Sequence, residues 1–365
     1  MADSLSGAVP VFDSHQHLFP DAEAEPSALP IIDSHIHLYP EAELSSLAWY
    51  TAASPLAGQR SVDEFRAATG SPANLQGFIF IEADRKNGEA KDWAAPLQEV
   101  SFARRIVAGQ PRDGEGHAPA DAKLCLAIVP WAPVVLGPAE LDRYLTAAEA
   151  EAGPAAWAKV KGFRYLLQDK PLGTGLADAF IAGLKLLGRR RFVFDVGVDQ
   201  HRRGRAQLEE MVDMIDRAHD GVDDEDDKVV FILNHLLKPD LTTISQTDPS
   251  FIAWRTAMFT LGKCRQTYMK LSGCFAEMPD SLKAQPAEVI FSALLPWLAV
   301  LIAAFGPSRI MFGSDWPVCT VGVGEDAWRK WHKVVDMTCD LAGLSYEDQK
   351  MLWAGTARRA YNIED

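Results

Sequence analysis

Two histidines separated by one residue end the short apolar stretch "IIDSHIHLYP", which begins at Ile31. Side chains alternate between the two faces of a strand, so Asp33, His35 and His37 are expected to point to the same side. Two imidazoles on one face can bind a metal ion together or act as an acid/base pair, although such a pair can also simply cap a strand. Other reactive residues in the sequence are needed to choose between the functional role and the capping role.

Seven later runs of apolar, β-type residues also end in a side chain that can do chemistry. These side chains are Glu82, Trp131, Arg164, Asp195, His235, Lys270 and Asp315. In a parallel barrel the carboxyl ends of all strands surround one mouth, where the active sites of this fold lie. Because residues with only structural roles would be scattered over both ends of the strands, the pattern favours a catalytic site.

The elements that must position these residues alternate between strand and helix. Strands are expected at 31–37, 75–84, 124–134, 159–167, 191–199, 228–235, 267–273 and 309–317. Amphipathic stretches such as 206–219 lie between them, with apolar residues at helical spacing. The alternation predicts a parallel sheet covered by helices. An open doubly wound sheet is the competitor, but no GxGxxG follows the first strand, so the sequence predicts a single-domain (β/α)8 TIM barrel.

Composition supports one large globular domain and argues against nucleic acid as a partner. The chain has 365 residues, of which 48% are hydrophobic and 24% are charged. These values are typical of a folded protein with ample apolar surface for a core. With 36 Lys and Arg against 50 Asp and Glu, the net charge of −14 would repel phosphate backbones.

Cysteine usage and the apolar segments indicate a cytoplasmic protein that does not enter membranes. The five cysteines never form a CxxC pair, so neither a disulfide framework nor a zinc-thiolate site is indicated. The start "MADSLSGAVP" lacks the basic and apolar regions of a secretory signal. The apolar run that begins at Phe291 is expected to be too short to span a bilayer. Nothing in the sequence decides whether the chain forms a homo-oligomer.

Several of these motifs, in this order, resemble one known family. "FIEADRK", "VKGFRYLLQDKP", "ILNHLLKP", "YMKLSG" and "MFGSDWPVC" are similar to motifs of the amidohydrolase superfamily. Within it, the chain resembles the sugar-lactonase branch of the amidohydrolase-2 family, which contains L-rhamnono-γ-lactonases and L-fuconolactonases. The resemblance covers essentially 31–363 and implies a (β/α)8 barrel that hydrolyses small cyclic esters.

The resemblance also implies roles for four residues. His35, His37, His235 and Asp315 match the catalytic positions, and Asp315 would be the general base that takes a proton from water. The three imidazoles would either bind one divalent metal with Asp315, with Zn²⁺ as the expected ion, or stabilise the oxyanion without a metal. The run "DVGVD" after Arg191 contains no histidine, which argues against a binuclear centre.

Substrate contacts follow from the chemistry of a sugar lactone, which presents hydroxyls and a ring ester. Such a ligand needs polar or charged partners and an aromatic surface on which to stack. The candidates are Glu82, Arg164, Asp195 and Lys270 for hydrogen bonds, and Trp131 and Trp316 for stacking. Arg164 and Asp195 could instead form an ion pair between neighbouring strands.

The motif "VFDSHQHLFP", which begins at Val11, repeats the first-strand pattern with His15 and His17. Family motifs continue from the second copy, so we expect residues 1–30 to form an N-terminal extension and residues 31–365 the barrel. The first copy could be a local duplication on the barrel surface, an artefact of gene prediction, or a strand that exchanges with the second copy.

The combined prediction is a hydrolase that opens a sugar-acid lactone to the aldonic acid. L-rhamnono-γ-lactone or a related deoxyaldonolactone is the expected substrate, as in L-rhamnose catabolism. One alternative on the same fold is a zinc-dependent decarboxylase of an aromatic or muconate-type acid, which would require its metal absolutely. A second alternative is a barrel that binds a ligand without turning it over.

Overall fold

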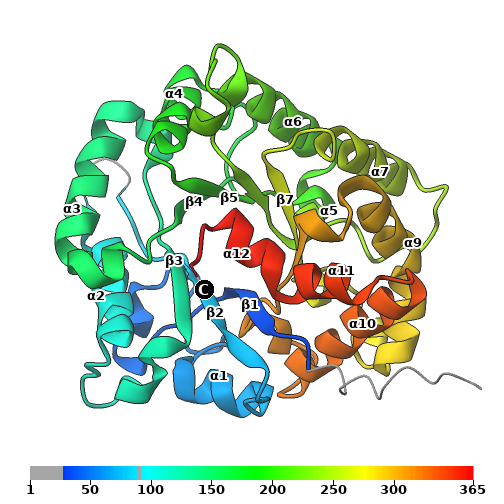
Figure 1. Cartoon of the computed structure of the whole chain (residues 1–365), viewed down its shortest axis with the longest axis horizontal. Coiled ribbons are helices and arrows are strands. Elements are labelled where there is room, and N and C mark those ends of the chain that lie inside the picture. The colour runs from blue at the N-terminus through cyan, green and yellow to red at the C-terminus, as the bar shows by residue number, and fades with distance from the viewer. Residues whose placement is uncertain (1–27, 89–91, 365) are drawn as a thin grey trace, which may run out of the picture.

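The computed structural model describes residues 28–88 and 92–364, and its strands follow one another around a ring (Figure 1). The strands are β1 Ile31–Ile36, β2 Leu75–Ile81, β3 Cys125–Val129, β4 Gly162–Leu166, β5 Val193–Gly197, β6 Phe231–Leu233, β7 Thr267–Leu271 and β8 Ile310–Phe312. All neighbouring strands pair in parallel, in one group of three strands and one group of five. Each expected strand is present, although most are shorter than the apolar runs suggested.

Two seams join these groups into a closed barrel. At the first seam, Ile128 of β3 forms a parallel bridge with Val160, just before β4. At the second, Ile36 of β1 forms a parallel bridge with Trp316, just after β8. The predicted (β/α)8 barrel is therefore confirmed, and β8 returns to lie beside β1.

Helices surround the strands and fill the long connections between them (Figure 1). They are α1 Val62–Thr69, α2 Ala94–Ala108, α3 Pro138–Trp157, α4 Asp178–Arg189, α5 Gln200–Arg203, α6 Arg205–His219, α7 Pro249–Leu261, α8 Asp280–Lys283, α9 Ala287–Phe305, α10 Ala327–Leu341, α11 Tyr346–Lys350 and α12 Thr356–Ala360. Within α3, Gly153 takes a non-helical conformation before Pro154 and kinks the helix. The helix expected over 206–219 corresponds to α6.

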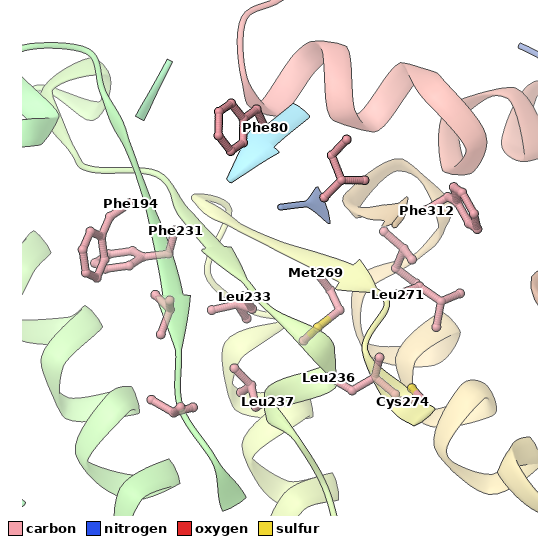
Figure 2. Packing of buried hydrophobic residues seen from close by; sticks show 14 of the residues in the cluster. Phe80, Phe194, Phe231, Leu233, Leu236, Leu237, Met269, Leu271, Cys274 and Phe312 are labelled. Atoms are coloured by element: carbon pink, nitrogen blue, oxygen red, sulfur yellow. The ribbon is translucent and has the colours of Figure 1, made fainter. Parts of the chain in front are cut away.

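Alternation along the strands divides the apolar core into two layers. One layer lies between strands and helices, where Phe194, Phe231, Met269 and Phe312 pack (Figure 2). The inner layer fills the barrel with small and branched side chains such as Ile79, together with residues of the C-terminal α12. In Figure 1 this helix lies across the centre of the ring, and it covers the amino-terminal end of the barrel.

Helix α9 is, within the described residues, the one helix long and apolar enough to cross a membrane by length and composition. It has 19 residues with a mean hydropathy of 2.1, so the expectation of a too-short segment is wrong: the helix begins before the apolar run. It packs between α7 and α10 and buries Ile290, Leu294 and Trp297 against the barrel. This packing accounts for part of its apolar character, since 33% of its most apolar 18-residue window is buried inside the structure.

The first copy of the repeated motif, with His15 and His17, lies outside the described residues. The division into an extension over 1–30 and a barrel over 31–365 therefore stays a prediction. The second copy forms β1, but its side chains do not alternate as expected. The pairing of β1 with β2 is irregular between Asp33 and Ile36, and Asp33 accepts a hydrogen bond from the Trp328 indole of α10 instead of joining the histidines.

Candidate active site

Four predicted residues meet at the carboxyl ends of three strands. His35 lies near the end of β1 and His37 follows it directly, His235 lies two residues beyond β6, and Asp315 lies three residues beyond β8. The Asp315 Oδ1 atom lies 3.4 Å from His37 Nε2 and 3.7 Å from the Nε2 atoms of both His35 and His235. All four residues are buried, with at most 8% of each residue exposed. The structure thus brings together the residues that the strand-end pattern singled out.

The backbone after β8 holds Asp315 beside the histidines. Its amide donates a hydrogen bond to the His35 carbonyl at 2.9 Å, and the His37 amide donates to the Trp316 carbonyl at 2.8 Å. Asp315 itself adopts a left-handed conformation with φ of 63°. The segment "GSDW" is therefore paired along the end of β1, which fixes the carboxylate relative to both imidazoles.

A glycine allows His235 to reach the same point. Gly273 follows β7 with φ of +65°, and a Cβ atom there would lie 2.3 Å from His235 Nδ1. Any other residue would therefore displace the imidazole. The Nδ1 atom also lies 2.9 Å from the Ser272 hydroxyl, so the end of β7 orients the ring by shape and by hydrogen bonding.

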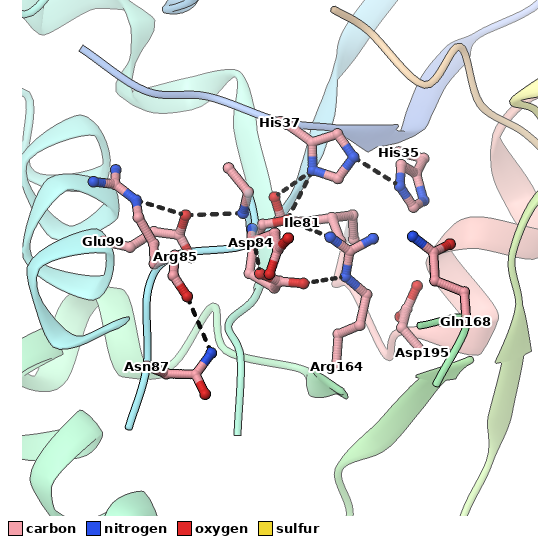
Figure 3. Close-up of polar contacts among 12 residues, drawn as sticks. His35, His37, Ile81, Asp84, Arg85, Asn87, Glu99, Arg164, Gln168 and Asp195 are labelled. Atoms are coloured by element: carbon pink, nitrogen blue, oxygen red, sulfur yellow. Dashed lines mark hydrogen bonds and ion pairs between the residues drawn. The ribbon is translucent and has the colours of Figure 1, made fainter. Parts of the chain in front are cut away.

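The tautomer of His37 follows from its neighbours. Its Nδ1 lies 3.0 Å from the Ile81 carbonyl oxygen and 2.8 Å from that of Glu82 (Figure 3). Carbonyl oxygens only accept hydrogen bonds, so Nδ1 carries the proton and Nε2 presents a lone pair to the centre of the site.

The opposite tautomer is indicated for His35. Its Nδ1 lies 3.1 Å from the Lys270 ammonium, which only donates. The proton of His35 is therefore on Nε2 and faces the His37 Nε2 atom, 3.2 Å away (Figure 3). Lys270 donates in turn to Asp195 at 2.6 Å, and Asp195 accepts from the Tyr361 hydroxyl at 2.7 Å. Burial lowers the pKa of Lys270 to about 8 even though Asp195 opposes the shift.

Electrostatics favour neutral imidazoles and an ionised carboxylate. Burial lowers the pKa of His235 to about 3 and, together with the Lys270 charge, lowers that of His35 well below its usual value. Burial alone would raise the pKa of Asp315, but the adjacent His235 outweighs it and lowers that pKa. Because the Asp315 carboxylate can only accept, its position opposite His235 Nε2 favours the His235 tautomer that carries the proton there.

The donor atoms fit a divalent metal ion. Those of His35, His235 and Asp315 all lie within 4.8 Å of one another. Neighbouring ligand atoms around a tetrahedral Zn²⁺ are about 3.4 Å apart, as expected from bond lengths near 2.1 Å. The 3.4 Å between His37 Nε2 and Asp315 Oδ1 matches this, and both atoms bring lone pairs with no proton between them. Two converging acceptors of this kind are stabilised by a cation.

A cavity of about 290 Å³ opens above this cluster. It is lined by His37, Tyr39, Trp49, Leu56, Ala83, Asp84, Arg164, Leu166, Gln168, Asp169, Gly197, Asn234, His235, Lys238, Asp315, Pro317 and Val318. Of the eight residues singled out for catalysis or polar substrate contacts, only His37, Arg164, His235 and Asp315 line it. His35 lies behind them and is fully buried.

The remaining polar candidates support the site instead of lining it. Glu82 accepts from the Arg164 Nε atom at 2.5 Å and from the Asp84 amide at 2.6 Å. It therefore orients Arg164 toward the cavity. Asp195 and Lys270 pair with each other inside the barrel, so the ion pair considered between Arg164 and Asp195 is not formed.

The two tryptophans expected to stack on a substrate pack against helices. Trp131 makes an edge-to-face contact with Tyr144 of α3 at 5.3 Å, and Trp316 makes one with Phe65 of α1 at 5.6 Å. Neither lines the cavity. The indole on the cavity wall belongs to Trp49, whose Nε1 donates to the Ala83 carbonyl at 2.9 Å.

Sequence reasoning missed most polar groups of the cavity wall. Asp84, Gln168, Asp169, Asn234 and Lys238 all lie one to five residues beyond a strand end. Burial and the nearby Glu82 raise the pKa of Asp84 to about 6. The side-chain amide of Asn234 is buried and has no hydrogen-bond partner within the described part of the chain. The motifs "NH" and "HLLKP" contain two of these residues and are the signals that could have located them.

Comparisons with known proteins identify the family of this chain. The model of the family described as amidohydrolase matches residues 32–363. An L-rhamnono-gamma-lactonase of Scheffersomyces stipitis is 31% identical over 321 residues, which cover 85% of this chain and 92% of that protein. An L-fucono-1,5-lactonase of Burkholderia multivorans is 30% identical over 217 residues, covering 58% of this chain and 66% of that protein.

Solved structures agree with the fold. A crystal structure of an amidohydrolase from Burkholderia multivorans with bound HEPES has a TM-score of 0.70 and 24% identity, covering 92% of this chain and all of that one. A second crystal form of an amidohydrolase from that organism contains zinc and has a TM-score of 0.68 at the same identity and coverage.

Proposed function

The chain belongs to the amidohydrolase family, and on that basis we propose that it hydrolyses the ring ester of a sugar-acid lactone to the open aldonic acid. The observation that carries the proposal is the pairing of an ionised Asp315 with a neutral His235 on the wall of one cavity. A base and a hydrogen-bond donor at one point are what addition of water to an ester carbonyl requires.

Asp315 acts as the general base. Its carboxylate accepts a proton from a water molecule as the water oxygen attacks the lactone carbonyl carbon. Because the His235 imidazole keeps its pKa low, the carboxylate is ready to accept without first losing a proton. The backbone hydrogen bonds around Asp315 hold it in place, so little reorganisation is needed at the moment of reaction.

His235 and Arg164 stabilise the negative charge that develops on the carbonyl oxygen. The Nε2–H of His235 lies on the cavity wall beside Asp315, and the Arg164 guanidinium is a permanent cation held by Glu82. Donors fixed before the reaction starts are worth about 3–4 kcal/mol of transition-state stabilisation in sites of this kind.

Collapse of the tetrahedral intermediate completes the reaction. The bond between the carbonyl carbon and the ring oxygen breaks, and the ring oxygen leaves with its electron pair. It takes up the proton that Asp315 received from water. The products are one carboxylic acid, which ionises, and one hydroxyl group, and Asp315 is again ionised.

His35, His37, His235 and Asp315 would hold a divalent metal ion, with Zn²⁺ the ion that suits three imidazoles and a carboxylate. When bound, such an ion supplies Lewis acidity toward a carbonyl oxygen or water. His35 carries a proton on Nε2 in the arrangement described, so uptake of the ion requires loss of that proton.

The proposed substrate is L-rhamnono-γ-lactone or a related deoxyaldonolactone. The cavity volume of about 290 Å³ suits one sugar ring, and its wall offers an indole, two cations and three carboxylates, one of them that of Asp315. The similarity to an L-rhamnono-gamma-lactonase over 92% of that protein supports this class of substrate. Within this proposal the enzyme works in the cytoplasm on a small molecule, and a homo-oligomer is compatible with it.

A pH-indicator assay on a panel of aldonolactones tests the proposal, with metal-stripped protein measured with and without added Zn²⁺. Acid release from a deoxyaldonolactone is the expected result. Acid release without metal would show that the protein residues alone are sufficient for hydrolysis. Release only with added Zn²⁺ would show that the histidines act as metal ligands. Failure to release acid from any lactone, with decarboxylation of an aromatic acid instead, would overturn the proposal.

A further inference from the structure

The turn that follows β6 has an unusual backbone. His235, Leu236, Leu237 and Lys238 have consecutive positive φ values of 54°, 54°, 61° and 49°. Residues with a side chain rarely adopt this left-handed conformation more than one at a time, because the Cβ atom approaches the following carbonyl oxygen. A strained conformation of this kind persists only where its surroundings hold it in place.

Contacts with other elements hold the turn. Leu236 and Leu237 are fully buried in the core. The Trp254 indole of α7 donates to the Leu236 carbonyl at 2.7 Å, and the His201 amide donates to the Lys238 carbonyl at 2.8 Å. The turn is therefore set by the protein itself, and both of its ends, His235 and Lys238, line the cavity.

The ammonium group at the end of this turn has an unusual partner. Lys238 Nζ donates to the Gln168 Oε1 atom at 2.7 Å, and within the described residues no carboxylate lies within 4 Å of it. Lys270, by contrast, is neutralised by Asp195 at 2.6 Å. An ammonium group has three N–H donors, so the contact with Gln168 leaves two for a ligand.

We propose that the pair formed by Gln168 and Lys238 binds hydroxyl groups of the lactone and so selects polyhydroxylated rings over unsubstituted ones. This inference rests on the proposed function and concerns the same cavity. Neither residue takes part in the addition of water, so the pair determines specificity and positions the substrate.

The chemistry of the cavity wall identifies the ligand class. The free N–H groups of Lys238 need acceptors, and the Asp84 and Asp169 carboxylates on the same wall can accept from donors of a ligand, with Asp169 also accepting from Gln168 Nε2 at 3.3 Å. A hydroxyl group is both donor and acceptor, so a ring with several hydroxyls can satisfy both sets. An unsubstituted lactone would leave these groups unpaired, and a site built for hydrogen bonds rejects such an analogue strongly.

The test compares L-rhamnono-γ-lactone with γ-butyrolactone, which has the same ring without hydroxyls. Lys238→Met and Gln168→Leu are each expected to lower kcat/KM for the hydroxylated lactone about 10- to 100-fold, which is the worth of a hydrogen bond to a charged group. The kcat/KM for γ-butyrolactone should change less than threefold. If γ-butyrolactone is not turned over, its inhibition constant is measured against the hydroxylated lactone instead of kcat/KM. This inhibition constant should be the same in both variants as in the wild type.

Two outcomes would overturn the inference: equal losses on both lactones in both variants, or no loss on the hydroxylated lactone. Gln168→Leu distinguishes a loss of substrate binding from a folding defect, because the Gln168 side chain is half-buried and lies outside the strained turn. Lys263→Met and Gln76→Leu, both exposed, are matched controls outside the cavity. A wild-type protein that hydrolyses neither lactone would instead contradict the proposed function, and this inference with it.

Discussion

The barrel interior below the site and the cavity above it both contain charged side chains, but they pair these charges differently. In the interior, Lys270, Asp195 and Tyr361 satisfy one another within 2.7 Å and are almost completely buried. In the cavity, Lys238 faces an amide and the Asn234 amide has no partner within the described residues.

The difference separates groups that maintain the fold from groups available to a ligand. A buried charge without its partner costs several kcal/mol, so the interior pairs are expected to be needed for stability. Polar groups left without a protein partner contribute little to stability and are common where a ligand completes their hydrogen bonds. Substitutions in the two regions should therefore affect different properties.

The largest expected effect is on turnover and comes from the cavity. Asp315→Asn removes the proposed base while keeping the shape of the side chain, so kcat should fall about 10³- to 10⁴-fold. Its hydrogen bonds through the backbone remain, and the melting temperature should change by only a few degrees. Steady-state kinetics and thermal unfolding measure both quantities. Near-normal turnover in this variant would remove Asp315 from the mechanism.

In the interior, Lys270→Met should act on stability. Among the described residues it leaves the buried Asp195 with only Tyr361 as a hydrogen-bond partner. It should therefore lower the free energy of unfolding by about 3–5 kcal/mol. The matched change in the cavity, Lys238→Met, should cost less than about 1 kcal/mol. Urea denaturation of the two variants measures this contrast directly. Equal losses of unfolding free energy in the two variants would show that both lysines contribute equally to stability, which would contradict the comparison.

Metal binding should stabilise the cavity region by mass action. At a free Zn²⁺ concentration 100 times Kd, unfolding should become less favourable by about 2.7 kcal/mol. Because His35 carries a proton on Nε2, calorimetry in buffers of different ionisation enthalpy should detect proton release on binding. A His37→Ala control should abolish the stabilisation. Unchanged stability in the wild type at high Zn²⁺ would contradict the assignment of the four residues as a metal site.

The smallest expected effect concerns Asp84. Its pKa in the folded protein is about 6, above its ordinary value of 3.8. A raised carboxyl pKa favours the fold at low pH, and this contribution is lost as pH rises through 6. Asp84→Asn should therefore melt higher than the wild type at pH 7.5 but not at pH 3.5, while its KM for a hydroxylated lactone rises. A difference in melting temperature independent of pH would contradict this account.

Much of the fold and of the catalytic cluster could be predicted from the sequence. Eight apolar runs predict eight strands, and a closed barrel places their carboxyl ends together, so His35, His37, His235 and Asp315 had to meet. The family resemblance gave the same four residues. The irregular pairing of β1 could not be foreseen, which is why Asp33 contacts α10 instead of the site.

The cavity wall was less predictable. Trp131 and Trp316 lie two and four residues beyond the ends of β3 and β8, but whether a side chain there faces the cavity or a helix depends on backbone geometry that composition does not reveal. Lys238 reaches the cavity through a left-handed turn that contains no glycine, so the usual sequence signal for positive φ is missing. Trp49 and Gln168 lie in loops whose paths depend on tertiary packing.

The central claim is that water adds to the lactone carbonyl, and hydrolysis in ¹⁸O-labelled water tests it most directly. We expect mass spectrometry to find one ¹⁸O atom in the carboxylate of the aldonic acid and none in the hydroxyl released from the ring. Label in that hydroxyl would mean that the bond between the ring oxygen and the sugar carbon breaks instead. That result would contradict the roles proposed for Asp315 and His235.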